Sequence, residues 1–381
     1  MRCSVPSKNP LPIDIILDAR MLHHSGIGTY LDGLLNEFEN NSFFETHSFG
    51  LALPTKLFPQ INGKLFRQPF DVPIYSIREQ IEYSFQMRHC RLWHAPHYNV
   101  PLFKKRTRLV VTIHDLIHWI FRKEFFSSTQ ALYAQFLFNR AIKQADKIIA
   151  VSEQTRNDLI QYFKAPPEKI RVIHEGVSSD FLTLPSQDDR QEFLKKHNLP
   201  ERFFLFVGLI KPHKNLVRLI RVFKKLKSEK KVESDLVIVG KKDRKYARGY
   251  ETLRNLGTGD GIHYLPLIDS RKELALLYAS ARSLIHPSLY EGFGLTCLEA
   301  MAVGAPVIVS KAASLPEVVG EAGYYVDPHS DESIRLGILK LEDNETLRRE
   351  LAEKGRLRVR QFNWAKAARE TAEVYKEVLG A

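Results

Sequence analysis

Cysteine is scarce in this chain, and its placement excludes two classes of protein. The sequence holds three cysteines, Cys3, Cys90 and Cys297. They lie far apart, form no C-x-x-C pair and cannot build an even disulfide framework. This distribution argues against a structural zinc site and indicates a reducing compartment, so we expect a cytoplasmic protein.

Long apolar runs are also lacking. No stretch approaches the roughly 18 apolar residues that span a bilayer. The nearest, LVVTIHDLIHWIF at 109–121, is interrupted by His114, Asp115 and His118. The first residues contain only a strand-sized apolar run at 13–18, so we expect no secretory signal.

Acidic residues are fewer than basic ones. The chain has 44 Asp and Glu and 56 Lys and Arg, which gives a formal net charge of +12. Such an excess indicates an anionic partner: nucleic acid, phospholipid or a phosphorylated metabolite. Zinc-finger, RNP and basic-zipper motifs are absent, so we do not expect nucleic acid. The basic residues spread along helical patterns such as 218–231, as on a solvated helix face. The cluster KKRTR at 104–108, with aromatics at 121–126, is compatible with a peripheral contact to an anionic membrane.

With 381 residues, 44% of them hydrophobic, the chain is long enough for two globular domains. Short β-branched runs without polar alternation recur between helical patterns and indicate parallel strands buried on both faces. The predicted strands are 13–18, 48–53, 91–95, 108–115, 147–152 and 169–177, then 203–208, 235–240, 261–266, 281–287, 305–310 and 323–328. Two βα series predict two doubly wound α/β sheets, with the polar segment 176–190 as a linker.

Ligands of open α/β sheets lie beyond the carboxyl ends of the strands, so residues at those ends are the site candidates. We expect the two sheets to present them across a cleft. The candidates are Gly26 and Gly28, His114, residues 208–214 and 240–242, and residues 291–299.

Four of these candidate residues admit a structural explanation as well as a functional one. Gly26 and Gly28 open the first helix and would let amides approach an anion, or would simply form a tight turn. Their spacing departs from G-x-G-x-x-G, which disfavours a nicotinamide cofactor. Lys214 precedes a helix, where a cation is unfavourable unless an anion neutralises it. His114 could be a base, a substrate contact or a structural histidine, and no second ligand set suggests a metal.

The stretch LYEGFGLTCLEAMAVGAPVIVS at 289–310 carries the most specific signal. Gly292 and Gly294 permit close approach of a ligand, and a helix beginning near Leu295 offers free N–H groups to a phosphate. Glu291 and Glu299 would repel that phosphate but accept hydrogen bonds from vicinal hydroxyls. A nucleotide sugar fits this arrangement, with Glu291 on the sugar and Glu299 on the ribose.

The segment HPSLYEGFGLTCLEAMAVGAPVIVS, whose glutamates are separated by seven residues, resembles the E-x7-E motif of retaining glycosyltransferases of family GT4. Other segments occur in the family's order, among them GIGTYLDGLL, VTIHDLIH, VSEQTRNDLIQYF, APPEKIRVIHEGV, VGLIKPHKNL, SLPEVVGEAGYYVDP and FNWAKAARETAEVYKEVL. The resemblance covers most of the chain apart from 54–105 and is closest to the mannosyltransferase-like branch.

The resemblance implies a GT-B fold. It implies an N-terminal acceptor-side domain at 1–180, a donor-binding domain at 181–362, and a final helix at 363–381 that crosses back to the first. It also implies catalytic roles for Glu291, His114 and Lys214. The implied donor-binding residues are Gly26, Gly28, Gly208, Lys214, Gly292, Phe293, Gly294, Leu295 and Glu299. Many family members carry an arginine just after the strand-end glycine, where this chain has Leu209. The mannosyltransferase-like branch often has an arginine before the lysine, where this chain has His213. Lys211 or Lys241 could take the place of the missing cation.

The sequence therefore predicts transfer of a hexose, with retention, from a nucleoside-diphosphate sugar to a saccharide or lipid-linked acceptor in polysaccharide synthesis. GDP-mannose is the preferred donor, with UDP-glucose or another UDP-sugar as an alternative. Fixed cations and helix dipoles are expected to replace a metal. A nucleotide-sugar epimerase of related fold and a non-catalytic nucleic-acid-binding protein are the alternative functions.

Overall fold

The computed structural model describes residues 13–24, 26–38, 43–60, 65–104, 106–124, 128–240, 261–265, 267–268 and 270–380. The candidate Lys241 lies outside these residues, as does Cys3. The chain divides into two compact units, residues 1–174 with 364–381, and residues 175–363. The first junction falls at 174/175 rather than at 180/181.

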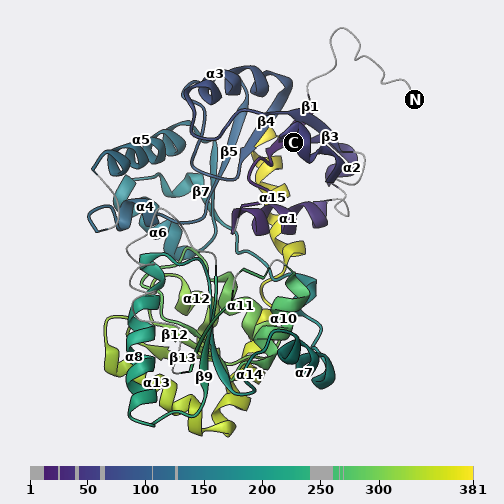
Figure 1. Cartoon of the computed structure of the whole chain (residues 1–381). Coiled ribbons are helices and arrows are strands. Elements are labelled where there is room, and N and C mark those ends of the chain that lie inside the picture. The colour runs from purple at the N-terminus through teal and green to yellow at the C-terminus, as the bar shows by residue number, and fades with distance from the viewer. Residues whose placement is uncertain are drawn as a thin grey trace. The chain divides into compact units, whose positions relative to one another are not determined.

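The N-terminal unit contains one parallel sheet (Figure 1). Among the described residues its strands are β1 Ile13–Asp18, β2 Phe49–Leu53, β3 Phe66–Pro69, β4 Cys90–Ala95, β5 Arg108–Ile113, β6 Lys147–Ala150 and β7 Ile170–Val172. Their order is β3-β2-β1-β4-β5-β6-β7, and every pairing is parallel. The order reverses between β1 and β4, as in a doubly wound sheet.

Helices cover both faces of this sheet. They are α1 Ile27–Phe38, α2 Phe43–Thr46, α3 Ile77–Gln86, α4 Ile117–Ile120, α5 Ser128–Gln144, α6 Glu153–Phe163 and α15 Trp364–Leu379. Side chains of α3, α5 and α6 share one core cluster, and those of α1, α2 and α15 share the other. Strands β1, β2, β4, β5 and β6 are therefore largely buried on both faces, which explains their mostly apolar sequences.

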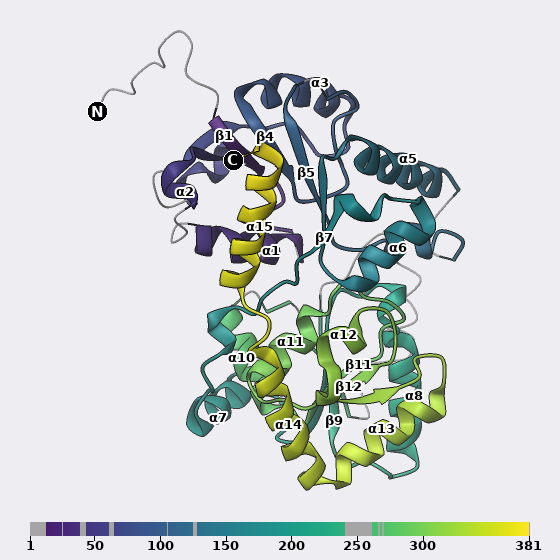
Figure 2. The ribbon, with the colours of Figure 1, turned by 180° about the vertical axis from the view of Figure 1, so that it is seen from behind.

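The C-terminal helix α15 belongs to the N-terminal unit, as Figure 2 shows by its place beside α1. Trp364, Ala368 and Tyr375 recur at helical spacing and are buried. The Tyr375 hydroxyl lies 2.6 Å from Nδ1 of His94 on β4. This buried hydrogen bond attaches the last helix to the middle of the sheet.

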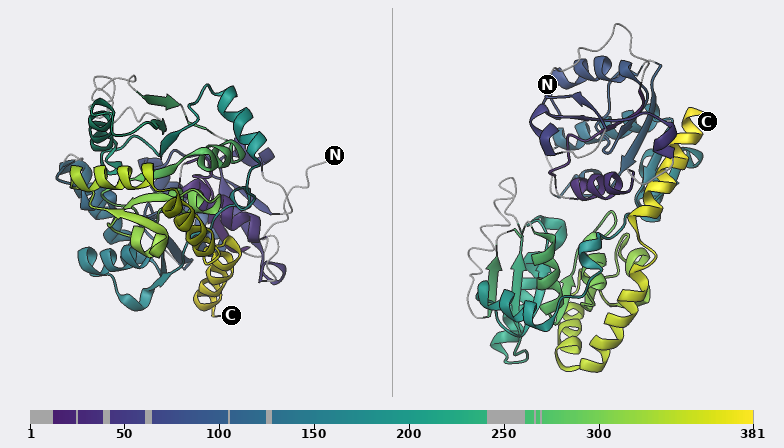
Figure 3. Two further views of the ribbon diagram at one scale, coloured as in Figure 1. Left: turned by 90° about the horizontal axis from the view of Figure 1, so that it is seen from below. Right: turned by 90° about the vertical axis from the view of Figure 1, so that its right-hand side faces the viewer.

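The second unit repeats the architecture. Its described strands are β8 Phe203–Val207, β9 Asp235–Val239, β10 Ile262–Leu265, β11 Ser283–His286, β12 Val307–Ser310 and β13 Gly323–Val326. They pair in parallel in the order β10-β9-β8-β11-β12-β13. The helices are α7 Gln187–Lys196, α8 Leu216–Ser228, α10 Arg271–Ser280, α11 Leu295–Ala302, α12 Leu315–Val319, α13 Asp331–Asp343 and α14 Glu345–Val359. Helix α8 packs on α13, and α10 packs on α7 and α11 (Figure 3).

The prediction of two doubly wound parallel sheets is confirmed, and each predicted strand is present within a few residues. Strand β3, with sequence FRQP, was not predicted because it is short, mostly polar and at the sheet edge. The predicted linker at 176–190 is wrong. Its Phe181 is buried against Tyr278, and α7 begins at Gln187, so this segment is part of the second unit.

Candidate functional site

The order of strands in the second unit reverses between β8 and β11, and the loops after these two strands carry the strongest site candidates. Gly208 follows β8, and its amide donates to the carbonyl of Val239 at 3.0 Å. Lys214 ends the 3-10 helix Pro212–Lys214 in the same loop. Its Nζ lies 2.7 Å from Oε1 and 2.9 Å from Oε2 of Glu291, in the loop after β11. A lysine just before a helix start is unfavourable unless a negative charge lies nearby. The Glu291 carboxylate supplies that charge here.

Glu291 is held in an ionised state inside the protein. Its residue is only 8% exposed. Burial alone would raise the pKa of this carboxyl, but Lys214 and His286 hold that pKa well below its usual value. Nε2 of His286 lies 2.8 Å from Glu291 Oε1, and His286 is completely buried at the end of β11. His286 stands within the segment that resembles family GT4, but the sequence pattern indicates no role for it.

Hydrogen bonds to backbone carbonyls join the loops after β8, β11 and β12. Ser314 Oγ donates to the carbonyls of Glu291 and Phe293, at 2.9 and 2.8 Å. The amide of Leu289 donates to the carbonyl of His213 at 2.7 Å. The Asn215 side chain donates to the carbonyl of Pro287 at 3.1 Å. The ion pair therefore sits on loops that are joined by several hydrogen bonds to the backbone.

The glycine turn leads directly into α11. Gly294 has φ +116°, a conformation that favours glycine, and a Cβ built there would lie 2.9 Å from Leu315 Cδ2. Gly292 and Phe293 precede it and are buried. No side chain caps the N-terminus of α11, which begins at Leu295. The first amides of this helix and its dipole are therefore oriented toward an anion at this end.

Glu299 lies one turn into α11 and differs from Glu291 in its charge state. Burial raises the pKa of Glu299 to about 7. Oε2 of Glu299 accepts a hydrogen bond of 3.0 Å from the buried hydroxyl of Tyr278 on α10. The two glutamates of the motif therefore have opposite electrostatic environments. One carries a permanent charge beside a cation, and the other titrates near neutral pH. The sequence did not indicate Tyr278.

His213 does not replace the cation that the family resemblance led us to expect. The residue is buried, and desolvation together with nearby Lys214 lowers its pKa to about 3. It is therefore neutral at physiological pH. Leu209 carries no charge, which leaves half-buried Lys211 as the described candidate in this loop.

The candidates of the N-terminal unit lie after β1 and β5. Gly26 is exposed and has φ +69°. Gly28 is buried within α1, its amide donates to the carbonyl of His24 at 2.6 Å, and a Cβ would lie 2.4 Å from the carbonyl oxygen of Leu22. The role of Gly28 visible in the structure is thus close backbone packing. His114 follows β5, with Nε2 at 3.1 Å from the carbonyl of Pro96.

Within the described ranges, no group of three or more His, Cys, Asp or Glu side chains could hold a metal ion. The same ranges contain no helix of the length and apolarity that a membrane crossing needs.

Two family models together match most of the chain. The model described as Glycosyltransferase Family 4 matches residues 26–181, and that described as Glycosyl transferases group 1 matches residues 188–358. O-antigen chain mannosyltransferase B of Escherichia coli is 30% identical over 322 residues, which are 82% of this chain and 81% of that protein. O-antigen chain mannosyltransferase RfbU of Salmonella typhimurium is 26% identical over 317 residues, 82% of each chain.

Solved structures agree on the fold. Alr3699/HepE of Anabaena in complex with UDP-glucose superimposes with a TM-score of 0.76 at 18% identity, over 96% of this chain and 100% of that one. Sucrose-phosphate synthase of Thermosynechococcus elongatus gives a TM-score of 0.74 at 21% identity, over 97% and 99% of the two chains. The chain therefore belongs to glycosyltransferase family 4, has the GT-B fold and is a hexosyltransferase.

Proposed function

We propose that this enzyme transfers mannose from GDP-mannose, with retention of anomeric configuration, to a hydroxyl of a saccharide or lipid-linked saccharide. The product would belong to a cell-surface polysaccharide. The observation that carries the proposal is the Lys214–Glu291 ion pair beside the uncapped start of α11. It combines a fixed cation, free helical amides and an ionised carboxylate in one place, which are the groups that a sugar diphosphate requires.

The relatives support mannose as the sugar. The proteins from Escherichia coli and Salmonella typhimurium are named O-antigen chain mannosyltransferases, and an enzyme of Mycolicibacterium hassiacum is named MMP alpha-(1->4)-mannosyltransferase. A UDP-sugar is the competing donor, since the Anabaena structure contains UDP-glucose. The 175–363 unit would bind the donor and the N-terminal unit the acceptor.

The proposed roles follow from where charge develops in the reaction. As the bond between the anomeric carbon and the phosphate oxygen breaks, negative charge grows on the diphosphate. Lys214 and the amides at Leu295 stabilise it without reorganising. Lys214 also neutralises Glu291, which would otherwise repel the same diphosphate. The Glu291 carboxylate accepts hydrogen bonds from sugar hydroxyls, and Glu299 accepts them from the ribose.

The remaining bonds can be made without a protein nucleophile. The acceptor oxygen forms the new bond to the anomeric carbon on the face that the phosphate leaves, and its proton passes to the departing phosphate oxygen. We propose that Lys214 and the helix dipole supply the positive charge, so no metal ion is required. Transfer unchanged by a chelating agent is the expected result, and restoration of a chelated enzyme by Mg²⁺ or Mn²⁺ would contradict it.

The donor can be identified by thermal unfolding in the presence of single nucleotide sugars. A ligand that binds only the folded state raises Tm, by an amount that corresponds to about 2.7 kcal/mol at a hundredfold excess over Kd. We expect GDP-mannose to raise Tm and UDP-glucose to raise it much less. If UDP-glucose raises Tm more than GDP-mannose does, the donor is UDP-glucose and the proposal of GDP-mannose is wrong.

The site can be tested with Glu291→Ala and Lys214→Ala, assayed for transfer to an acceptor. Both should lose at least about a hundredfold in kcat/KM if they stabilise the transition state. Lys354→Ala is the matched control, because it removes a lysine from an exposed ion pair, with Glu350, in the same unit. Near-normal transfer by both site variants would refute the assignment. Product formed from the donor alone would instead identify an epimerase.

A further inference from the structure

Helix α3 of the N-terminal unit exposes an apolar stripe to solvent. Ile77, Ile81 and Phe85 are 87%, 61% and 50% exposed. They are spaced by four residues and so lie along one side of the helix. The opposite side carries Glu79 and Tyr83, which are buried. Helix α3 therefore carries apolar side chains on the side that faces solvent, opposite the side that is buried.

Helix α5 repeats this pattern on the same side of the sheet. Leu132, Tyr133 and Phe136 are 65%, 47% and 47% exposed, while Leu137 and Phe138 are buried in the core cluster that α5 shares with α3. In Figure 1, α3 lies along the top of this unit and α5 lies at its left-hand side.

The loop between β4 and β5 joins the two helices and adds another apolar side chain. The amide of Leu102 donates to Oε1 of Gln80 on α3, and its carbonyl accepts from Nε2 of Gln144 on α5, both at 2.8 Å. Phe103, the next residue, is 75% exposed. We call the combined surface the apolar face; it consists of Ile77, Ile81, Phe85, Phe103, Leu132, Tyr133 and Phe136.

Basic side chains accompany the apolar face. Helix α5 carries Arg140 and Lys143 and contains no acidic residue. The Arg140 guanidinium lies 5.7 Å from the ring centre of Phe103. On α3, Arg78 is exposed between Ile77 and Ile81. Large exposed apolar patches are uncommon on soluble monomers and mark interaction surfaces. Helix α3 also carries the half-buried Glu82, so the excess of positive charge comes from α5, and it favours an anionic partner.

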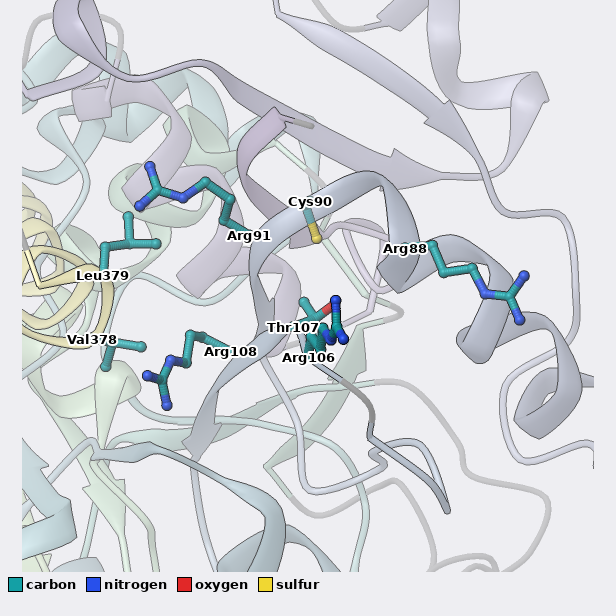
Figure 4. Close-up of a pocket in the computed structure, with 8 residues that line it drawn as sticks. All are labelled: Arg88, Cys90, Arg91, Arg106, Thr107, Arg108, Val378 and Leu379. Atoms are coloured by element: carbon teal, nitrogen blue, oxygen red, sulfur yellow. The ribbon is translucent and has the colours of Figure 1, made fainter. Parts of the chain in front are cut away.

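A hollow of about 640 Å³ lies where α3 ends (Figure 4). Its lining includes Arg88, Arg91, Arg106 and Arg108, with Val378 and Leu379 from α15. Figure 4 shows Arg91 and Arg108 on the side of the two apolar residues, and Arg88 on the other side of Cys90.

This arginine hollow adjoins the apolar face and keeps a positive charge. The Arg88 guanidinium lies 5.0 Å from the ring centre of Phe85. Arg91 pairs with Asp14 at 3.0 Å and Arg108 with Asp146 at 3.1 Å. Two carboxylates thus offset only part of the charge of four arginines, and the hollow suits a phosphate group.

We propose that the apolar face docks onto a bilayer that contains anionic lipids, with a lipid phosphate in the arginine hollow. The apolar side chains would enter the boundary between headgroups and acyl chains, while the arginines and lysines contact the charged surface. A second copy of the chain fits less well. A symmetric dimer through this face would oppose its own basic residues and supply few carboxylates to pair with them.

The experiment is cosedimentation of the full chain with vesicles of phosphatidylcholine alone or with phosphatidylglycerol, at low and high salt. Neither donor nor acceptor is present, so the outcome is separate from the test of the proposed reaction. The apolar variant is Ile81→Glu with Phe103→Glu. Its matched control is Leu336→Glu with Leu357→Glu, two residues of the second unit that are 50% and 59% exposed.

The charge variant is Arg88→Glu with Arg106→Glu, and its matched control is Lys340→Glu with Arg360→Glu in the second unit. Thermal unfolding of every variant checks that it is folded. We expect binding to the anionic vesicles only, weakened by salt. Each test variant should weaken binding by at least about tenfold, and the controls by much less.

Several outcomes would overturn the proposal. They are no vesicle binding at low salt, equal binding to neutral vesicles, or loss of binding in the controls as large as in the test variants. Light scattering is the final check. A concentration-dependent dimer that the apolar variant abolishes, without vesicle binding, would assign the face to a second copy instead. Protection by free inorganic phosphate without vesicle binding would reduce the hollow to a soluble-anion site.

Discussion

Lys214 and Glu291 are 77 positions apart in the sequence, yet their charged groups meet at 2.7 Å where the strand order of the second sheet reverses. Both side chains are largely buried, at 15% and 10% exposure. The pair therefore serves the fold as well as the proposed chemistry, and experiments must separate the two.

A pair of substitutions makes that separation. Lys214→Ala leaves the Glu291 carboxylate buried without its main cation and should lower the free energy of unfolding by about 3 kcal/mol. Lys214→Ala combined with Glu291→Gln removes the buried charge and should recover most of this loss, while transfer activity stays low. Denaturant unfolding and kcat/KM of both variants are the measurements. Recovery of activity along with stability would mean that the pair is only structural.

The proposed role of Glu299 predicts that donor binding depends on pH. Burial raises the pKa of Glu299 to about 7, so the carboxylate that we propose accepts ribose hydroxyls is lost as pH falls through 7. We expect KM for the donor to rise between pH 8 and pH 6, and Glu299→Gln to remove this dependence while weakening binding throughout. A KM profile that is identical in the wild type and the variant would contradict the role of Glu299.

The same group affects stability with a definite sign. Because the pKa of Glu299 is higher in the folded than in the unfolded chain, the folded state holds its proton more tightly, and stability falls as pH rises from about 4.5 to 7. Glu299→Gln should therefore be more stable than the wild type at pH 8, by on the order of 2 kcal/mol, and not at pH 4.5. Equal differences at both pH values would show that burial of this charge is not the cause.

Gly294 should tolerate no side chain. Gly294→Ala places a methyl group at positive φ and 2.9 Å from Leu315, so we expect a loss of about 1 to 3 kcal/mol and weaker donor binding as the helix start shifts. Gly380→Ala is the control, because Gly380 also has positive φ but open space around a Cβ. Unfolding midpoints and donor KM report the two effects, and a loss no larger than that of the control would argue against steric conflict.

His94 should make the N-terminal unit sensitive to acid. Burial and nearby His114 lower its pKa to about 3, so the folded chain keeps it neutral while the unfolded chain takes up a proton below about pH 6.5. Stability is therefore lost as pH falls, by about 2 kcal/mol at pH 5 from this group alone. His94→Gln should flatten the dependence between pH 7 and pH 5, and the exposed His89→Gln should not. An unchanged slope in His94→Gln would contradict the argument.

The sequence by itself determined the fold class and the chemical character of the site. Continuous apolar runs between amphipathic segments require parallel strands covered on both faces, and this pattern is local. The residues from Glu291 to Glu299 likewise form one short segment, so a glycine turn, a helix start and two carboxylates could be predicted together. The sequence did not predict strand β3, because a short polar strand at the sheet edge has no continuous apolar run.

The tertiary structure decided which groups control those carboxylates. Lys214 and His286 hold the pKa of Glu291 well below its usual value, whereas burial raises the pKa of Glu299 to about 7 against the opposing effect of the Tyr278 hydrogen bond. These partners lie on different strands and helices, and sequence spacing does not encode contacts between them. The exposed stripes of α3 and α5 were hidden for a related reason. Apolar residues at helical spacing look the same in sequence whether they face a core or solvent, and only the packed sheet determines which side is covered.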